Sequence, residues 1–255
     1  MADHTTPWHP GEPCWADITV TDLERSKKFY QDVFGWEYTG GEPEFGGYTN
    51  ATVGGRTVAA MAPPMPGWDD QSAWVVYLGS DDIDKTHEAV KAAGGHPVME
   101  PMQVGPFGKM GLWTDPTGAL VGAWQGAEHQ GFGVVDEPGS VAWCDLMSAD
   151  FDKASAFFAD AFGFAYEPMG EGYALYTVPT QPDRPAGGIG QAADGSTPGW
   201  NVCFHVDRIE TALERIERAG GKTLGEPTDF EFGRFASASG PDGETFVVFT
   251  GKGDA

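Results

Sequence analysis

The chain has 255 residues, of which 40% are hydrophobic and 13% aromatic, so it can form hydrophobic cores and is not a disordered chain. Its 38 acidic and 15 basic residues give a formal charge of −23, which disfavours binding to nucleic acid or to an anionic membrane surface. Three cysteines without a Cys-x-x-Cys pair argue against a disulfide scaffold and a structural zinc site. Because we also find no signal peptide and no apolar run of about 20 residues, we predict a cytoplasmic protein.

The sequence is a tandem repeat. The run Trp15-Ala16-Asp17 recurs as Trp143-Cys144-Asp145, and Phe34-Gly35-Trp36 recurs as Phe162-Gly163-Phe164, in both cases 128 positions further on. A constant offset over about 25 positions without a gap indicates duplication of a whole domain. We therefore predict an N-terminal arm, a first domain, a linker, a second domain and a short tail, with the boundaries 1–10, 11–125, 126–138, 139–251 and 252–255.

The first half contains two successive patterns of strand, helix and further strands. Residues 15–20 alternate as a strand does, Asp22 is a suitable N-cap, and apolar residues at helical spacing predict a helix that ends at Gly35. Short strands are predicted next at 36–38, 48–53 and 57–61. The pattern then restarts, with a strand at 74–78, a helix at 83–93, and strands at 110–114 and 120–124.

The second half repeats this pattern. Its later part predicts a strand at 200–206, a helix at 209–219 and strands at 235–238 and 245–249, offset by 126 positions from the first half, as Trp200 is from Trp74. The predicted fold class is therefore α+β, in which each domain consists of two βαβββ modules that form one curved, cupped mixed sheet with its helices outside. We expect a pocket on each concave face, and we call these the first cup and the second cup.

Two motifs stand out in the first half: Asp22-Leu23-x-x-Ser26-x-x-Phe29-Tyr30-x-x-x-Phe34-Gly35, and the later turn Asp115-Pro116-x-Gly118. Both resemble motifs of the vicinal oxygen chelate superfamily, which includes glyoxalases, bleomycin-resistance proteins, fosfomycin-resistance enzymes and extradiol dioxygenases. Both halves show this resemblance, so it extends over nearly the whole chain and leaves out only the arm and the linker. The Trp-x-Asp opening and the Phe-Gly-Trp helix end are most similar to two-domain actinobacterial members described as glyoxalase or hydroxylase-like.

The resemblance implies a divalent metal, held by His, Gln or Glu side chains on the strands that face each cup. The implied ligand positions are occupied in this sequence by Trp15 and Trp143, by Val75 and Asn201, by Gly122 and Val247, and by residues around Ala60 and Gly188. An indole, an isopropyl group and a hydrogen atom are not metal ligands, and Asn201 alone cannot form a site. We therefore predict that the protein uses no metal and no other cofactor.

The alternation of side chains along a strand selects the residues that face each cup. The ligand-binding residues predicted in this way are Trp15, Tyr77 and Trp124 in the first cup, and Trp143, Asn201 and Phe249 in the second. The candidate catalytic residues are Asp17, Asp145 and His205, because a carboxyl or imidazole group in a pocket can act as an acid or a base. A structural role stays open for each, since an aspartate can cap a turn and a single histidine is often only packed.

These residues predict a metal-independent protein that binds a small aromatic or heterocyclic metabolite in its cupped sheets. One alternative is an enzyme of the glyoxalase or hydroxylase type, which would act as a lyase, isomerase or hydroxylase through Asp17, Asp145 or His205. Another alternative is a resistance protein that sequesters an antibiotic. The expected partner is a small molecule rather than nucleic acid or a membrane, and the two halves predict a monomer built as an internal pseudo-dimer, or a homodimer.

Overall fold

The computed structural model describes residues 4, 6–64, 72–193 and 198–252, so most of the predicted tail lies outside the described part. The first half contains β1 (Pro13–Thr19), α1 (Leu23–Phe34), β2 (Glu37–Gly40), the short 3-10 helix η1 (Pro43–Phe45), β3 (Thr49–Val53), β4 (Arg56–Ala62), β5 (Trp74–Gly79), α2 (Ile83–Ala92), β6 (His96–Val104), β7 (Gly108–Thr114) and β8 (Leu120–Gly126). The second half contains β9 (Val141–Ser148), α3 (Phe151–Phe162), β10 (Ala165–Pro168), β11 (Tyr173–Thr177), β12 (Gly187–Gln191), β13 (Gly199–His205), α4 (Ile209–Arg218), β14 (Lys222–Thr223), β15 (Thr228–Phe230), β16 (Gly233–Ser239) and β17 (Thr245–Gly251).

The first helix of each half begins and ends with the same local chemistry. Asp22 Oδ1 accepts a hydrogen bond from the Arg25 amide at 3.0 Å, and Gly35 adopts the left-handed conformation (φ 74°) that ends α1. Asp150 and Gly163 play the same two roles for α3. The repeated motif therefore produces two equivalent helices. The apolar face of α1 packs on both sheets, since the Tyr30 ring contacts Trp74 of the first half and Phe246 of the second.

Each half forms one mixed sheet. The strand order is β2-β3-β4-β1-β5-β8-β7-β6 in the first half and β10-β11-β12-β9-β13-β17-β16-β14 in the second, with β15 paired to β16. The two modules of a half meet at an antiparallel central pair, β1 with β5 and β9 with β13. Within each module the first strand runs parallel to the last, as β1 does with β4 and β5 with β8. The predicted α+β fold with two tandem cupped sheets is confirmed.

The sequence did not locate the strand at one edge of each sheet. β6 contains Pro97 and Pro101, and its register with β7 shifts twice, so its sequence lacks the regular alternation of a strand. Proline is tolerated there because β6 is the last strand of its sheet. The corresponding part of the second half is divided into the two short strands β14 and β15, which both pair with β16.

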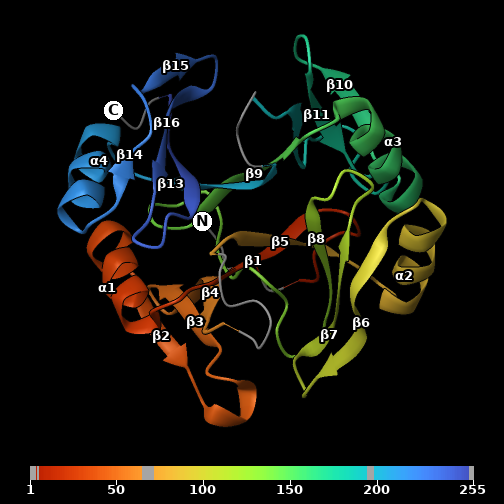
Figure 1. The fold of residues 1–255 in the computed structure, drawn as a ribbon, viewed down its shortest axis with the longest axis horizontal. Coiled ribbons are helices and arrows are strands. Elements are labelled where there is room, and N and C mark those ends of the chain that lie inside the picture. The colour runs from red at the N-terminus through yellow and green to blue at the C-terminus, as the bar shows by residue number, and fades with distance from the viewer. Residues whose placement is uncertain (1–3, 5, 65–71, 194–197, 253–255) are drawn as a thin grey trace.

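The two halves pack against each other through their helices. Figure 1 shows α1 beside α4 and α2 beside α3, so each helix pair contains one helix from each half. Hydrogen bonds also join the halves, among them those from Tyr30 Oη to Glu244 Oε1 (2.9 Å), from Trp36 Nε1 to the Gly139 carbonyl (2.7 Å) and from Trp200 Nε1 to the Leu120 carbonyl (2.8 Å). Among the described residues, none of the helices is long and apolar enough to cross a membrane.

Candidate functional site

The first cup holds a hydrogen-bonded chain of side chains that ends at a buried carboxyl group. Trp15 Nε1 donates to Tyr48 Oη at 2.8 Å, and Tyr48 Oη donates to Asp17 Oδ2 at 2.9 Å. Tyr77 on β5 also donates a hydrogen bond to Asp17. Burial raises the pKa of Asp17 to about 6, while the two tyrosine hydrogen bonds act in the opposite direction. The first cup therefore contains a carboxyl group to which two tyrosines donate.

The linker after β8 covers this first cup. The His129 ring packs edge-on against Trp15, with the ring centroids 4.4 Å apart, and Phe132 lies 5.6 Å from the same indole. Trp124 Nε1 donates to the His129 carbonyl at 2.9 Å, and burial lowers the pKa of His129 to about 4. As a result, Trp15 and Trp124 are only 3% and 8% exposed. The first cup is filled largely by the protein's own aromatic side chains.

The second cup repeats the carboxyl group with a different set of donors. Asp145 Oδ1 accepts hydrogen bonds from Trp143 Nε1 at 2.8 Å and from Tyr173 Oη at 2.7 Å. No described residue donates a hydrogen bond to Asp145 Oδ2. This oxygen is not fully buried in the described part of the chain, so it retains contact with solvent. Burial raises the pKa of the Asp145 carboxyl. One oxygen of Asp145 is thus fixed by the protein and the other is available.

Strand register places the remaining residues of the second cup. On β13, Asn201 pairs with Asp145, and Cys203 pairs with Trp143 on one side and Val247 on the other. His205 pairs with Phe249, which in turn pairs with Phe235. The partly exposed side chains of this face include Trp143, Asp145, Tyr173, Asn201, Phe235, Val247 and Phe249. The alternate residues on the helix side of the same strands are buried: Cys144, Leu146, Val202, Phe204 and Val248. The second cup is therefore the more open of the two.

His205 lies at the opposite end of the second cup from Asp145. It stands four residues beyond Asn201 on β13, which corresponds to about 13 Å along the strand. His205 Nδ1 is 3.4 Å from Asp136 Oδ1, and Asp136 is the one non-glycine residue with positive φ (58°) in the described part of the chain. Asp145 and His205 are therefore too far apart to exchange a proton directly.

The predicted site residues thus divide into two groups. Trp15, Asp17, Tyr77 and Trp124 lie together in the first cup, and Trp143, Asp145, Asn201, His205 and Phe249 lie in the second. Burial keeps the pKa of the Cys203 thiol well above its ordinary value, so Cys203 is a neutral side chain rather than a nucleophile beside His205. The sequence missed Tyr48 and Tyr173, which the fold brings to the two aspartates from the third strand region of each half.

The residues at the implied metal positions do not fit a divalent ion. A Cβ atom at Gly188 would collide with Asp145 Oδ1 and Tyr173 Oη, and one at Gly122 would collide with the Tyr77 ring, so neither position has room for a ligating side chain. In the described part of the chain, no three or more His, Cys, Asp or Glu side chains come together in a group that could hold a metal. Tryptophan and aliphatic groups do not supply the missing donors.

Comparison with known proteins agrees with the fold. Residues 3–123 match the family model of the Glyoxalase/Bleomycin resistance protein/Dioxygenase superfamily, and residues 142–249 match that of the Glyoxalase-like domain. The "Putative glyoxylase CFP32" of Mycobacterium bovis is 35% identical over 94% of this chain and 95% of that protein, and the anthracycline biosynthesis protein DnrV of Streptomyces peucetius is 33% identical over 95% and 94%.

Solved structures show the same fold at low sequence identity. The Mn(II)-bound glyoxalase from Novosphingobium aromaticivorans has a TM-score of 0.70 at 18% identity and covers 94% of this chain and 82% of that chain. This likeness concerns the fold alone, since only 18% of the aligned residues are identical. The two family matches and the full-length relatives show that the chain belongs to the glyoxalase/bleomycin resistance protein/dioxygenase superfamily.

Proposed function

We propose that this protein binds a small aromatic or heterocyclic metabolite in the second cup, without a metal ion. The observation that supports this most is the arrangement of Asp145, whose Oδ1 is held by Trp143 and Tyr173 while Oδ2 has no protein donor among the described residues. A buried carboxylate is unfavourable without hydrogen bonds, so a ligand that donates to Oδ2 would be bound strongly. The ligand would carry a hydroxyl or a protonated amine.

The distance along the strands of the second cup supports a ligand with several rings. About 13 Å of strand separates the rows of Asp145 and His205, and Phe235 and Phe249 provide aromatic surface between the centre of the cup and its edge. The formal charge of −23 favours a neutral or cationic guest over an anionic one. Two relatives from Streptomyces are named as anthracycline biosynthesis proteins.

Binding would involve one molecule per chain, because the linker covers the first cup. His129 and Phe132 pack on Trp15 where a ligand ring would otherwise stack, and Asp17 already accepts hydrogen bonds from two tyrosines. The paired helices and the buried contacts between the halves are consistent with a monomer in which the second half supplies the contacts of a partner, and a homodimer is the alternative. We place this function in the cytoplasm, in line with the unpaired cysteines.

Isothermal titration calorimetry with a soluble anthracycline as the probe would test the proposal. We expect one site per chain, unaffected by EDTA, and a Kd that rises about 10- to 100-fold in Asp145→Asn, because a hydrogen bond to a charged group contributes about 1.5–3 kcal/mol. The matched control is Asp17→Asn, which makes the same change in the covered cup and should leave the Kd within about twofold. Equal effects of the two variants, two sites per chain, or loss of binding in EDTA would contradict the proposal.

Acid–base catalysis in the second cup is a second candidate, because burial raises the pKa of Asp145, and a carboxyl group with a raised pKa can act as a general acid or base. The same titration distinguishes this candidate from simple sequestration. If the bound compound is converted, mass spectrometry detects a product of altered mass or retention time, and Asp145→Asn abolishes its formation at saturating ligand. If the protein only sequesters its ligand, the compound is recovered unchanged from every variant.

A further inference from the structure

Two phenylalanine rings meet at the rim of the first cup, and we call this place the mouth of the cup. Phe45 of η1 and Phe107 of the β6–β7 turn have their ring centroids 5.6 Å apart and their ring planes at 66°. η1 follows β2 and the turn joins β6 to β7, which lie at opposite edges of the first sheet, so this contact bridges the cup. Phe45 also stands three residues before Tyr48, the tyrosine that donates to Asp17.

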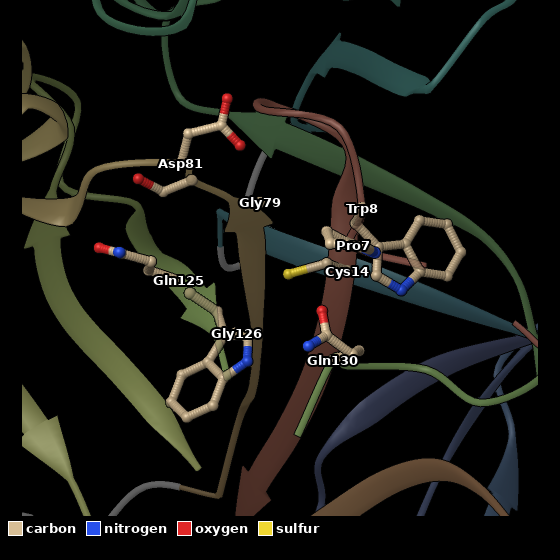
Figure 2. Close-up of a pocket in the computed structure, with 10 residues that line it drawn as sticks. Pro7, Trp8, Cys14, Gly79, Asp81, Gln125, Gly126 and Gln130 are labelled. Carbon is tan, nitrogen blue, oxygen red and sulfur yellow. The ribbon is translucent and has the colours of Figure 1, made fainter. Parts of the chain in front are cut away.

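The linker fixes the turn that carries Phe107. The Ala127 and His129 amides both donate to the Phe107 carbonyl, at 2.8 and 3.2 Å. Figure 2 shows the next part of the linker, Gln130, beside Cys14 of β1, where both line the same pocket. The mouth of the first cup is therefore held closed by segments of the chain itself.

The second half repeats one of the two mouth residues. The run Phe107-Gly108-Lys109 corresponds to Phe232-Gly233-Arg234, and the two glycines begin the equivalent strands β7 and β16. These glycines also have nearly the same φ, 156° and 157°. Phe232 on the β15–β16 turn therefore occupies the position that Phe107 has in the first half.

The second half has no counterpart of Phe45. In the first half, a backbone hydrogen bond closes a loop over residues 41–48, which includes η1. The equivalent loop of the second half covers only residues 169–173, and its one aromatic side chain is the tyrosine at its end, which donates to the buried carboxyl group. Figure 1 shows this loop between β10 and β11 at the same end of the second half as β15. Phe232 is accordingly 56% exposed, against 36% for Phe107.

A row of aromatic rings connects Phe232 with the face of the second cup. Phe235 and Phe249 pair in register on that face. The Phe230 ring packs on both, at 5.5 and 6.0 Å, and the Phe232 ring packs on Phe230 at 5.9 Å. Exposed apolar side chains that adjoin one another commonly mark a binding site. The exposed rings of Phe230 and Phe232 are thus continuous with the surface to which we assign the ligand.

We propose that Phe230 and Phe232 form an aromatic subsite at the mouth of the second cup, where a distal aromatic ring of the ligand takes the place that Phe45 has in the first half. This inference rests on the function proposed above for the second cup. The row of Phe249 is already about 13 Å of strand from the row of Asp145, and Phe230 lies beyond it. A single ring bound at Asp145 is too short to reach the mouth, so the subsite selects extended ligands with several rings.

Isothermal titration calorimetry of the full chain tests this selection, with a soluble anthracycline as the multi-ring probe and tyramine as the single-ring probe. Phe232→Ala should raise the Kd of the anthracycline about 3- to 10-fold, as expected for the loss of one aromatic pair, and leave that of tyramine within about twofold. Asp145→Asn should weaken both probes, because both use the carboxyl group. The matched control is Phe107→Ala, which makes the same change at the closed mouth and should leave both Kd values unchanged.

A loop exchange tests the comparison between the two mouths directly. Replacing residues 169–172 by a copy of residues 41–47 brings η1 and its phenylalanine to the second cup. This variant should bind the anthracycline at least about tenfold more weakly and bind tyramine as before, and Phe45→Ala within the copied loop should restore most of the affinity. Unchanged anthracycline binding in Phe232→Ala, or an equal loss in Phe107→Ala, would overturn the inference, while an effect of Asp145→Asn would still support the proposed function. A wild-type protein that binds neither probe would contradict both.

Discussion

Replacing Asp17 by Asn tests whether the first cup buries a carboxyl group at a cost to stability. Burial raises the pKa of Asp17 from 3.8 to about 6. Between these two pH values the folded protein binds a proton more tightly than the unfolded chain, so the free energy of unfolding falls as the pH rises through this window. The loss is complete above pH 6 and amounts to about 3 kcal/mol, since a tenfold change in proton affinity corresponds to about 1.4 kcal/mol.

Asparagine cannot ionise, so Asp17→Asn should remove this dependence on pH. The free energy of unfolding of the variant minus that of wild type should therefore rise by up to about 3 kcal/mol between pH 4 and pH 7.5. Urea unfolding followed by tryptophan fluorescence measures both values. Subtracting the two curves cancels the titration of all other groups. Tyr48→Phe is the control, because it keeps the carboxyl group and removes a donor; it should lower stability at pH 7.5 by about 1–3 kcal/mol. A stability difference between Asp17→Asn and wild type that does not vary with pH would refute the reasoning.

Three further substitutions test the packing that supports the cups. Tyr30→Phe leaves the buried Glu244 without its donor from the other half, and urea unfolding should show a loss of about 1–3 kcal/mol. Gly122→Val has no room beside the Tyr77 ring and should lower the free energy of unfolding by about 1–3 kcal/mol in urea unfolding; an unchanged value would show that the Tyr77 ring moves aside without strain. Gly139→Ala requires φ of 85° and should lower the melting temperature, whereas an unchanged value would show that the backbone relaxes there.

The fold could be predicted from the sequence because its signals are local and repeated. Trp15 and Asp17 recur at a constant offset as Trp143 and Asp145, and in the structure each aspartate pairs with the fifth or corresponding strand at the same register, Asp17 with Val75 and Asp145 with Asn201. Helix ends follow from the capping residue at the start and a glycine at the end, which are interactions within four residues. Such patterns can be recognised in the sequence without a structure.

The partners of the two aspartates could not be predicted in the same way. Tyr48 and Tyr173 are 125 positions apart rather than 128, because the segments before the third strands differ in length, so the repeat did not align them. Their hydrogen bonds to Asp17 and Asp145 depend on how three strands lie side by side. The linker posed a similar problem, since its composition predicts a connection but does not indicate that His129 folds back onto the first cup.

The difference between the cups can be traced to two positions on the shared scaffold. In the first cup, Tyr77 fits over Gly122 and reaches Asp17 as a second tyrosine donor. The corresponding pair in the second cup is Cys203 and Val247, which are directly paired in register and can supply no comparable donor to Asp145. The same strand geometry therefore satisfies the carboxyl group internally in one half, and in the other it leaves one oxygen of Asp145 without a donor among the described residues. Since covering a cup with protein side chains stabilises the fold whereas an open cup permits binding, we expect the first half to contribute mainly stability and the second half to contribute recognition.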